Sequence, residues 1–364
     1  MIYLLKAMPS ISLKEDYCMY EEYFSQAVAY NPVLSEYGAT LEKDGRVTFR
    51  IEAKEAHSVS ISPFGQECNL TKDDKGIWTG TFDIGKGFKY LNVKVDGADV
   101  LSPFLPIGYG CCRPMNFVDI PCGDYYLQRN VPHGTVSRLF YPSKITGRTE
   151  SCLIYLPPDW DAAAVYPVLY LQHGWGENET GWVQQGKVNY ILDNLIASGQ
   201  AEKMLVVMCN GMVQINGQAN TTIFPNVLTE EVIPYIQRRF HVKQDKWNRA
   251  VAGLSMGSMH TSVAALTHPE LFGYAGLFSG FLRSPFTKEN PHLKALEDAA
   301  AFTNNYRVFF RGMGDEDQFL SAFLEDDEIL KSKRLTTDRR MYHGGHDWQV
   351  WRESAHDFLQ LIFH

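Results

Sequence analysis

The segment Gly253-Leu254-Ser255-Met256-Gly257 fits the pattern G-x-S-x-G, in which a serine lies on a tight turn between two glycines. An apolar run, RAVAGL, precedes the serine, and a stretch with helical patterning follows it. The serine is therefore predicted at the carboxyl end of a strand and the start of a helix, where free backbone N–H groups can stabilise a developing negative charge. This position predicts a nucleophile. The alternative is a tight turn that contains an incidental serine.

A serine hydroxyl becomes a good nucleophile only when a base takes its proton and an acid orients that base. In folds that carry this motif, the acid follows the seventh strand of the sheet and the histidine follows the eighth. His346, in GGHDW after the eighth predicted strand, is therefore the predicted base. Asp315, the first acidic residue after the seventh, is predicted to orient it, with Asp317 as the alternative. A structural role is predicted for His343.

The loop after the third predicted strand, LQHGWGENETGW, can supply a second donor for an oxyanion. His173 and Gly174 let the chain turn, so the backbone N–H of Trp175 can face the same pocket as that of Met256. These two N–H groups are the predicted oxyanion hole, and His173 is predicted to support the loop. The complete set of groups requires neither a metal ion nor an organic cofactor.

Two regions with different hydrophobic patterns surround these residues. Residues 38–122 contain short alternating strands and predict a small immunoglobulin-like β-sandwich, after an N-terminal extension at 1–37 with a short predicted helix around EEYFSQAV. After a linker at 123–134, residues 135–364 alternate apolar strands with helical stretches, which predicts a three-layer α/β sheet. The eight strands of this sheet are predicted at 136–144, 150–158, 167–174, 204–211, 249–255, 273–280, 307–314 and 339–345.

The composition is typical of a soluble globular protein, with 45% hydrophobic and 21% charged residues. The net charge of −8 argues against nucleic acid or an anionic membrane as a partner, and no apolar stretch has the length of a membrane span. The first residues, MIYLLK, contain too few apolar residues for a signal-peptide core, so a cytoplasmic location is expected, or a secreted or periplasmic one if a leader was removed. Seven scattered cysteines indicate free thiols.

Five segments taken together resemble the feruloyl-esterase and esterase D-like group of α/β-hydrolases: QHGWGENETGW, NYILDNLIASG, RAVAGLSMGS, HPELFGYAGLFSG and GGHDWQVWR. The resemblance covers about residues 135–364. It implies a serine carboxylic ester hydrolase in which Ser255 is the nucleophile, His346 the base and Asp315 the orienting acid. Residues 38–120 resemble the early-set β-sandwich often fused to such esterases, which is related to glycogen-binding carbohydrate modules.

The resemblance implies that the substrate is a hydroxycinnamoyl ester, with ferulate released through an acyl-enzyme from arabinoxylan oligosaccharides or small aromatic esters. An acetylxylan or siderophore esterase with the same triad is the enzymatic alternative. A glycan-binding protein with an inactive hydrolase domain is the non-enzymatic one. Ser258 and Arg311 depart from the family pattern, which weakens the substrate prediction but leaves the triad unchanged.

An aromatic acyl group needs an apolar slot with few polar anchors. The residues predicted to bind it, each with core or scaffold packing as the alternative, are Trp182, Gln214, Phe224 and Trp348. The segment 281–305 is too short for a full lid domain, so an open site is expected. The β-sandwich could bind glycan, or it could only support the esterase or help it form a homodimer. The aromatic residues considered for glycan binding are Trp78, Tyr90 and Tyr109.

Overall fold

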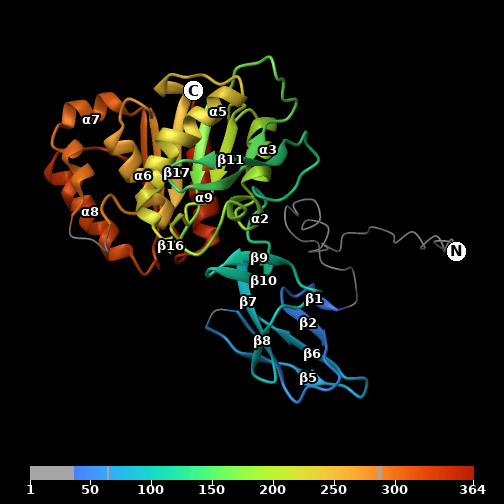
Figure 1. Cartoon of the computed structure of the whole chain (residues 1–364). Helices are drawn as coiled ribbons and strands as arrows, with labels where there is room; N and C mark the ends of the chain where they lie inside the picture. Colours follow the sequence, from blue (N-terminus) through green and yellow to red (C-terminus); the bar gives the residue numbers. More distant parts are fainter. Residues whose placement is uncertain (1–36, 64, 285–288) are drawn as a thin grey trace.

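The computed structural model describes residues 37–63, 65–284 and 289–364 (Figure 1). The short helix predicted around EEYFSQAV lies outside the described residues. Within the described ranges, none of the helices combines the length and the hydropathy that crossing a bilayer requires.

Eight strands form one sheet in the order β11-β12-β14-β13-β17-β18-β19-β20. Their bounds are β11 Thr135–Ser143, β12 Arg148–Leu156, β13 Val168–Gln172, β14 Leu205–Cys209, β17 Arg249–Leu254, β18 Tyr274–Phe278, β19 Val308–Gly314 and β20 Asp338–Tyr342. Each overlaps one of the eight predicted strands. The pairs β11–β12 and β12–β14 are antiparallel, and every pair from β14 to β20 is parallel. The carboxyl ends of β13, β17, β18, β19 and β20 therefore share one edge, where open α/β sheets bind their ligands.

Helices cover both faces of this sheet, which gives the predicted three layers. One face packs against α2 Gly181–Gln184, α3 Val188–Ala197 and α9 Trp348–Leu359. The other face packs against α4 Phe224–Asn226, a π-helical turn at Val227–Val232, α5 Ile233–Arg239, α6 Met256–Thr267, α7 Ala299–Asn305 and α8 Leu320–Ser332. Strand β17 shows how the sequence specifies this arrangement. Ala250, Ala252 and Leu254 enter one core, and Val251 enters the other.

Residues 38–120 form an all-β part, termed the β-region, with two antiparallel sheets. The first sheet contains β1 Gly38–Leu41, β2 Val47–Glu52, β5 Thr71–Lys72 and β6 Ile77–Phe82. The second contains β3 Val59–Pro63, β4 Cys68–Asn69, β7 Gly87–Val95, β8 Ala98–Val100, β9 Ile107–Gly110 and β10 Arg113–Ile120. Phe49 and Ile51 of the first sheet and Ile61, Leu91 and Val118 of the second meet in one core. The all-β character is as predicted.

Trp78 lies inside the core of the β-region, with its indole N–H donated to the carbonyl oxygen of Ala53 at 2.9 Å. The structure therefore favours core packing over glycan binding for Trp78. Tyr90 and Tyr109 lie beside α2, because the amide of Gln185, at the end of that helix, donates to the Tyr90 hydroxyl and to the Tyr109 carbonyl oxygen.

A buried ion pair joins the β-region to the α/β sheet and its helices. Arg352 of α9 donates to both carboxylate oxygens of Asp119 of β10, at 3.1 and 2.6 Å, and to the carbonyl oxygen of Gln185. The ammonium group of Lys187 lies 3.8 Å from the same carboxylate. Burial opposes ionisation of Asp119, but the charges of Arg352 and Lys187 outweigh it and lower the pKa of the carboxyl. Asp119 is therefore a counterion for two buried cations.

Asp119→Ala should destabilise the protein strongly, because it leaves these two cations buried without their counterion. We expect a loss of about 3–5 kcal/mol in the free energy of unfolding, measured by urea denaturation. The control is Asp99→Ala, which breaks an exposed pair with Arg113 and should cost less than about 1 kcal/mol. Equal losses in the two variants would contradict the structural role of Asp119.

Candidate active site

Ser255 lies in the turn between β17 and α6, with φ 51° and ψ −117°. Few residues with a side chain adopt a positive φ, and such strain persists only where the surrounding structure enforces it. A side chain on Gly253 would lie 2.5 Å from the carbonyl oxygen of Gly257. One on Gly257 would lie 2.6 Å from the carbonyl oxygens of Gln172 and His173. Both glycines are thus required by the close packing of this turn against the end of β13.

The hydroxyl of Ser255 lies next to the imidazole predicted to act on it. Ser255 Oγ is 2.8 Å from His346 Nε2, and Nδ1 of the same ring is 2.8 Å from Asp317 Oδ2. The Asp317 side chain is 0% exposed, and its other oxygen accepts the backbone N–H of Phe319 at 2.9 Å. With Nδ1 donating to Asp317, Nε2 can accept the serine proton. The predicted contact between Ser255 and His346 is confirmed.

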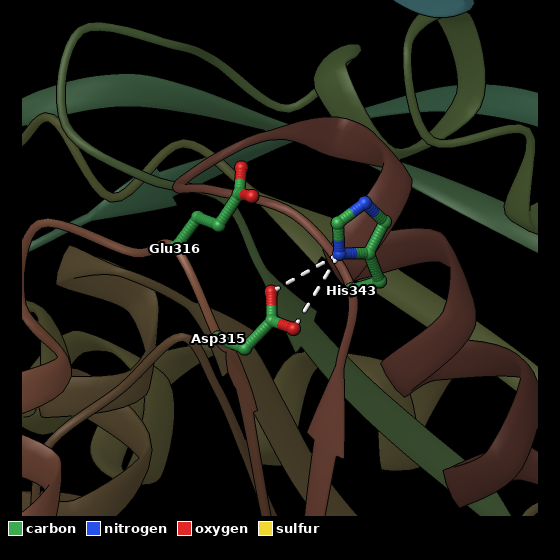
Figure 2. Close-up of side chains that lie close together, drawn as sticks. All are labelled: Asp315, Glu316 and His343. Carbon is green, nitrogen blue, oxygen red and sulfur yellow. Dashed lines mark hydrogen bonds and ion pairs between the residues drawn. The ribbon is translucent and has the colours of Figure 1, made fainter.

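The prediction of Asp315 as the orienting acid is wrong, because the carboxylate at His346 belongs to Asp317. Strand β19 ends at Gly314, and the backbone N–H of Asp315 still donates to the carbonyl oxygen of Tyr342 in β20 at 2.8 Å. The Asp315 side chain is half exposed, lies 3.4 Å from Nδ1 of His343 and accepts the backbone N–H of Gly344 at 3.0 Å (Figure 2). Asp315 and Glu316 form a turn that the backbone N–H of Asp317 closes on the carbonyl oxygen of Gly314 at 3.3 Å, and Asp317, directly after this turn, lies against the base.

Asp315, Glu316 and His343 lie close enough together to be considered as metal ligands. One donor atom from each lies within 4.8 Å of the others, and all three side chains are exposed (Figure 2). Exposed carboxylates often gather in this way without an ion, and the contacts of Asp315 with His343 and Gly344 already explain its position. We assign no metal role to this cluster.

Two backbone N–H groups beside the nucleophile are free to bind an oxyanion. Trp175 and Met256 both line the cavity that contains Ser255. Among the described residues, no hydrogen-bond acceptor is found for the backbone N–H of either. The N–H of Met256 is in the first turn of α6, where backbone donors have no partner within the helix, and together with that of Trp175 it can bind a developing negative charge.

His173 supports the loop that carries Trp175, as predicted. Its Nδ1 lies 2.7 Å from the carbonyl oxygen of Gly174, and its Nε2 accepts the backbone N–H of Gly211 at 2.9 Å. Burial lowers the pKa of this imidazole to about 4. A neutral ring with one donor and one acceptor satisfies both contacts.

A cavity of about 520 Å³ opens at Ser255. Its walls are mainly apolar, with a few polar groups among them. The lining residues are Gly174, Trp175, Glu177, Thr221, Leu254, Ser255, Met256, Met259, Phe281, Gln318, Phe319, His346 and Trp351.

The four residues predicted to bind substrate do not line this cavity. The prediction that Trp182, Phe224 and Trp348 bind substrate is wrong, because each side chain is buried in one of the two cores that flank the sheet. Trp182 donates its indole N–H to Gln172, and its ring packs edge-on against Trp348. Gln214 is exposed on the short hairpin β15 Gln214–Ile215 and β16 Gln218–Ala219, where it accepts a hydrogen bond from Arg148.

Sequence reasoning missed most of the aromatic wall. Phe281 follows β18 and Phe319 follows β19, so both lie at the sheet edge that binds ligands, and this position was the available signal. Their rings pack at 5.2 Å, and Phe319 also contacts the His346 ring at 5.0 Å. Trp351 packs in the core on one face of the sheet and also lines the cavity, where its ring packs edge-on against His346.

The loop that carries Trp175 also contains Glu177, whose carboxyl group is buried. It accepts hydrogen bonds from the backbone N–H of Gly174 at 3.3 Å, the indole of Trp348 at 3.1 Å and the hydroxyl of Tyr90 at 3.3 Å. Burial raises the pKa of Glu177 to about 7, although these three donors act in the opposite direction. Between these two pKa values, about 4.5 and about 7, Glu177 is protonated in the folded protein and ionised in the unfolded chain.

Glu177→Gln should change how stability depends on pH. The folded-state pKa of about 7 lies above the ordinary value of 4.5, so the wild type loses stability as the pH rises between these values. The amide of the variant does not titrate. From pH 5 to pH 8, the free energy of unfolding of the wild type should fall relative to the variant by roughly 2–3 kcal/mol. Chemical denaturation at both pH values measures this, and a constant difference between the proteins would contradict it.

Comparison with known proteins agrees with this geometry. A family model described as "Putative esterase" matches residues 143–359. An endo-1,4-beta-xylanase/feruloyl esterase of Xylanibacter ruminicola is 35% identical over 342 residues, which are 89% of this chain and 45% of that protein. The endo-1,4-beta-xylanase Y of Acetivibrio thermocellus is 28% identical over 270 residues, 67% of this chain and 24% of that protein. The chain thus spans less than half the length of these two relatives.

Solved structures share the fold. A ferulic acid esterase from Anaeromyces mucronatus, determined in complex with ferulic acid, superposes with a TM-score of 0.60 at 23% identity, over 66% of this chain and 96% of that one. The enterobactin esterase of Shigella flexneri superposes with a TM-score of 0.63 at 15% identity, over 90% of this chain and 96% of that one. Because the family model covers more than half of the sequence, this protein belongs to that esterase family and is a carboxylic ester hydrolase.

Proposed function

We propose that this esterase hydrolyses hydroxycinnamoyl esters, releasing ferulate from feruloylated arabinoxylan oligosaccharides or from small aromatic esters. The observation that carries the proposal is the aromatic and apolar cavity at the nucleophile. Its volume of about 520 Å³ is within the usual range for small-molecule sites. The name of the Xylanibacter ruminicola relative includes feruloyl esterase activity, which supports the same substrate class.

The proposed reaction proceeds through an acyl-enzyme. Ser255 Oγ attacks the ester carbonyl carbon while His346 Nε2 takes the hydroxyl proton, and the backbone N–H groups of Trp175 and Met256 bind the oxyanion. The intermediate collapses when the C–O bond to the alcohol breaks and the alcohol receives the proton from His346. Water then gives a proton to His346 and attacks the acyl carbon. The bond from that carbon to Ser255 Oγ breaks as His346 returns the proton to Oγ, and the acyl group leaves as a carboxylic acid. Asp317 holds the imidazole in the required tautomer throughout.

The walls of the cavity suit a planar aromatic acid. Phe281, Phe319 and Met259 offer two rings and a polarisable thioether, which favour stacking and edge contacts with another ring. Gln318 and Thr221 are polar groups in the same lining that can meet a phenol hydroxyl or a methoxy oxygen. The side chain of Trp175 is 64% exposed, so it can contact the sugar that the acyl group leaves behind.

A substrate panel tests the proposed substrate class. With methyl ferulate, acetylated xylan and a catecholate siderophore as substrates, we expect kcat/KM to be highest for methyl ferulate, measured by release of free acid. Ser255→Ala should abolish turnover of every substrate that the wild type accepts. A preference for acetylated xylan or for the siderophore would refute the feruloyl proposal and favour the corresponding alternative.

Phe281→Ala should weaken the binding of the aromatic acid selectively. Loss of one aromatic wall should raise KM for methyl ferulate about tenfold. KM for p-nitrophenyl acetate should change less than about threefold, because an acetyl group is too small to reach that wall. Steady-state kinetics of both substrates on the same preparation measure the effect. An equal change for the two would mean that the slot lies elsewhere.

Asp317→Asn and Asp315→Asn form a matched pair that tests which acid orients the base. Asp317→Asn should lower kcat by a factor on the order of 10³–10⁴, because the amide favours the wrong imidazole tautomer. Asp315→Asn should leave kcat within about threefold of the wild type, because this carboxylate only contacts His343 and Gly344. The kcat of each variant is measured by hydrolysis of p-nitrophenyl acetate. The reverse order of effects would contradict a triad of Ser255, His346 and Asp317.

A further inference from the structure

The loop that carries Trp175 is held on one side by the carboxyl group of Glu177. Glu177 is buried, and its Oε2 accepts the backbone N–H of Gly174, the residue directly before Trp175. Its Oε1 accepts the indole N–H of Trp348, which lies two residues after His346. One carboxyl group therefore fixes the oxyanion loop relative to the start of the helix that follows the base.

The third donor to Glu177 comes from the β-region. Tyr90 of β7 lies with its hydroxyl 3.3 Å from Glu177 Oε1 and 3.2 Å from the carbonyl oxygen of Tyr109, and this hydroxyl accepts a hydrogen bond from the amide of Gln185 at 2.7 Å. The ring of Tyr90 passes close to Gly110 of β9, where any side chain would overlap it. The β-region is thus shaped to bring this phenol to the back of the loop.

The β-region also holds the other side of the loop. The turn between β9 and β10 consists of Cys111 and Cys112, with φ of 51° and 63°, as in the tight two-residue turns of hairpins. The backbone N–H of Cys112 donates to the carbonyl oxygen of Gly176 at 2.8 Å. Gly176 has a φ of 78°, and a side chain there would lie 3.0 Å from the nitrogen of Cys112. Trp175 therefore lies between Gly174, which is held by Glu177 of the same loop, and Gly176, which is held by Cys112 of the β-region.

We infer that the β-region is part of the catalytic apparatus, with Tyr90 and Glu177 as positioning residues that hold the backbone N–H of Trp175 where the oxyanion forms. A donor displaced by a few tenths of an ångström still allows substrate to bind but stabilises the transition state less. The inference rests on the oxyanion role proposed above for Trp175. It does not depend on which ester is the natural substrate.

Tyr90→Phe tests this inference, because it removes only the hydroxyl that reaches Glu177. With p-nitrophenyl acetate as substrate, kcat should fall about 5- to 10-fold with KM within about twofold of the wild type. The inhibition constant of a boronic acid, which forms a tetrahedral adduct with the serine, should rise by a similar factor. Tyr125→Phe is the matched control, since the Tyr125 hydroxyl is buried with no hydrogen-bond partner among the described residues, and it should change neither value.

A double-mutant cycle separates positioning through Glu177 from a general loss of stability. Glu177→Gln replaces one carboxyl oxygen by an NH₂ group, which cannot accept a hydrogen bond from the donors that surround Glu177. This variant should therefore lower kcat by at least as much as Tyr90→Phe. The double variant should match Glu177→Gln alone within about twofold, because both changes break the same contact. Additive losses, or a Tyr90→Phe enzyme with the kcat of Tyr125→Phe, would overturn the inference. A wild type that binds the boronic acid no better than Ser255→Ala does would refute the proposed triad and oxyanion hole themselves.

Discussion

The strained backbone of Ser255 is the constraint on which the rest of the site depends. Its positive φ turns the hydroxyl out of the sheet edge, and this conformation persists only because Gly253 and Gly257 let the turn approach the end of β13. That approach brings the start of α6 next to the loop after β13, so Met256 and Trp175 both line the cavity that contains Ser255. The base and acid then need only arrive at the same edge, which parallel β19 and β20 ensure.

The features that sequence could predict are those fixed by periodicity and by position along a strand. Apolar runs such as RAVAGL enter two cores at once, so the eight strands and the sheet edge with Ser255 and His346 followed from the pattern alone. The choice between Asp315 and Asp317 did not follow. It depends on the shape of the turn after β19, which is fixed by backbone hydrogen bonds from Asp315 and Glu316 to Tyr342 and Gly344, residues distant in sequence.

The substrate slot was harder to predict for a related reason. Aromatic residues near the motif were the natural candidates, but Trp182 and Trp348 point into the core, and their indole groups satisfy buried acceptors. The wall is formed instead by Phe281 and Phe319, single residues after strand ends, where a loop without periodicity sets the direction of the side chain. Composition cannot distinguish these two uses of an aromatic ring.

The buried pair of Arg352 and Asp119 also limits how genes for such proteins can recombine. The guanidinium comes from the last helix and the carboxylate from the last strand of the β-region, so the partners lie far apart in the coding sequence. A recombination event that removed the β-region, or exchanged it for an unrelated module, would leave a charge inside the remaining protein. We expect evolutionary shuffling to keep both residues or to replace both together, so that the two regions are inherited as a single unit.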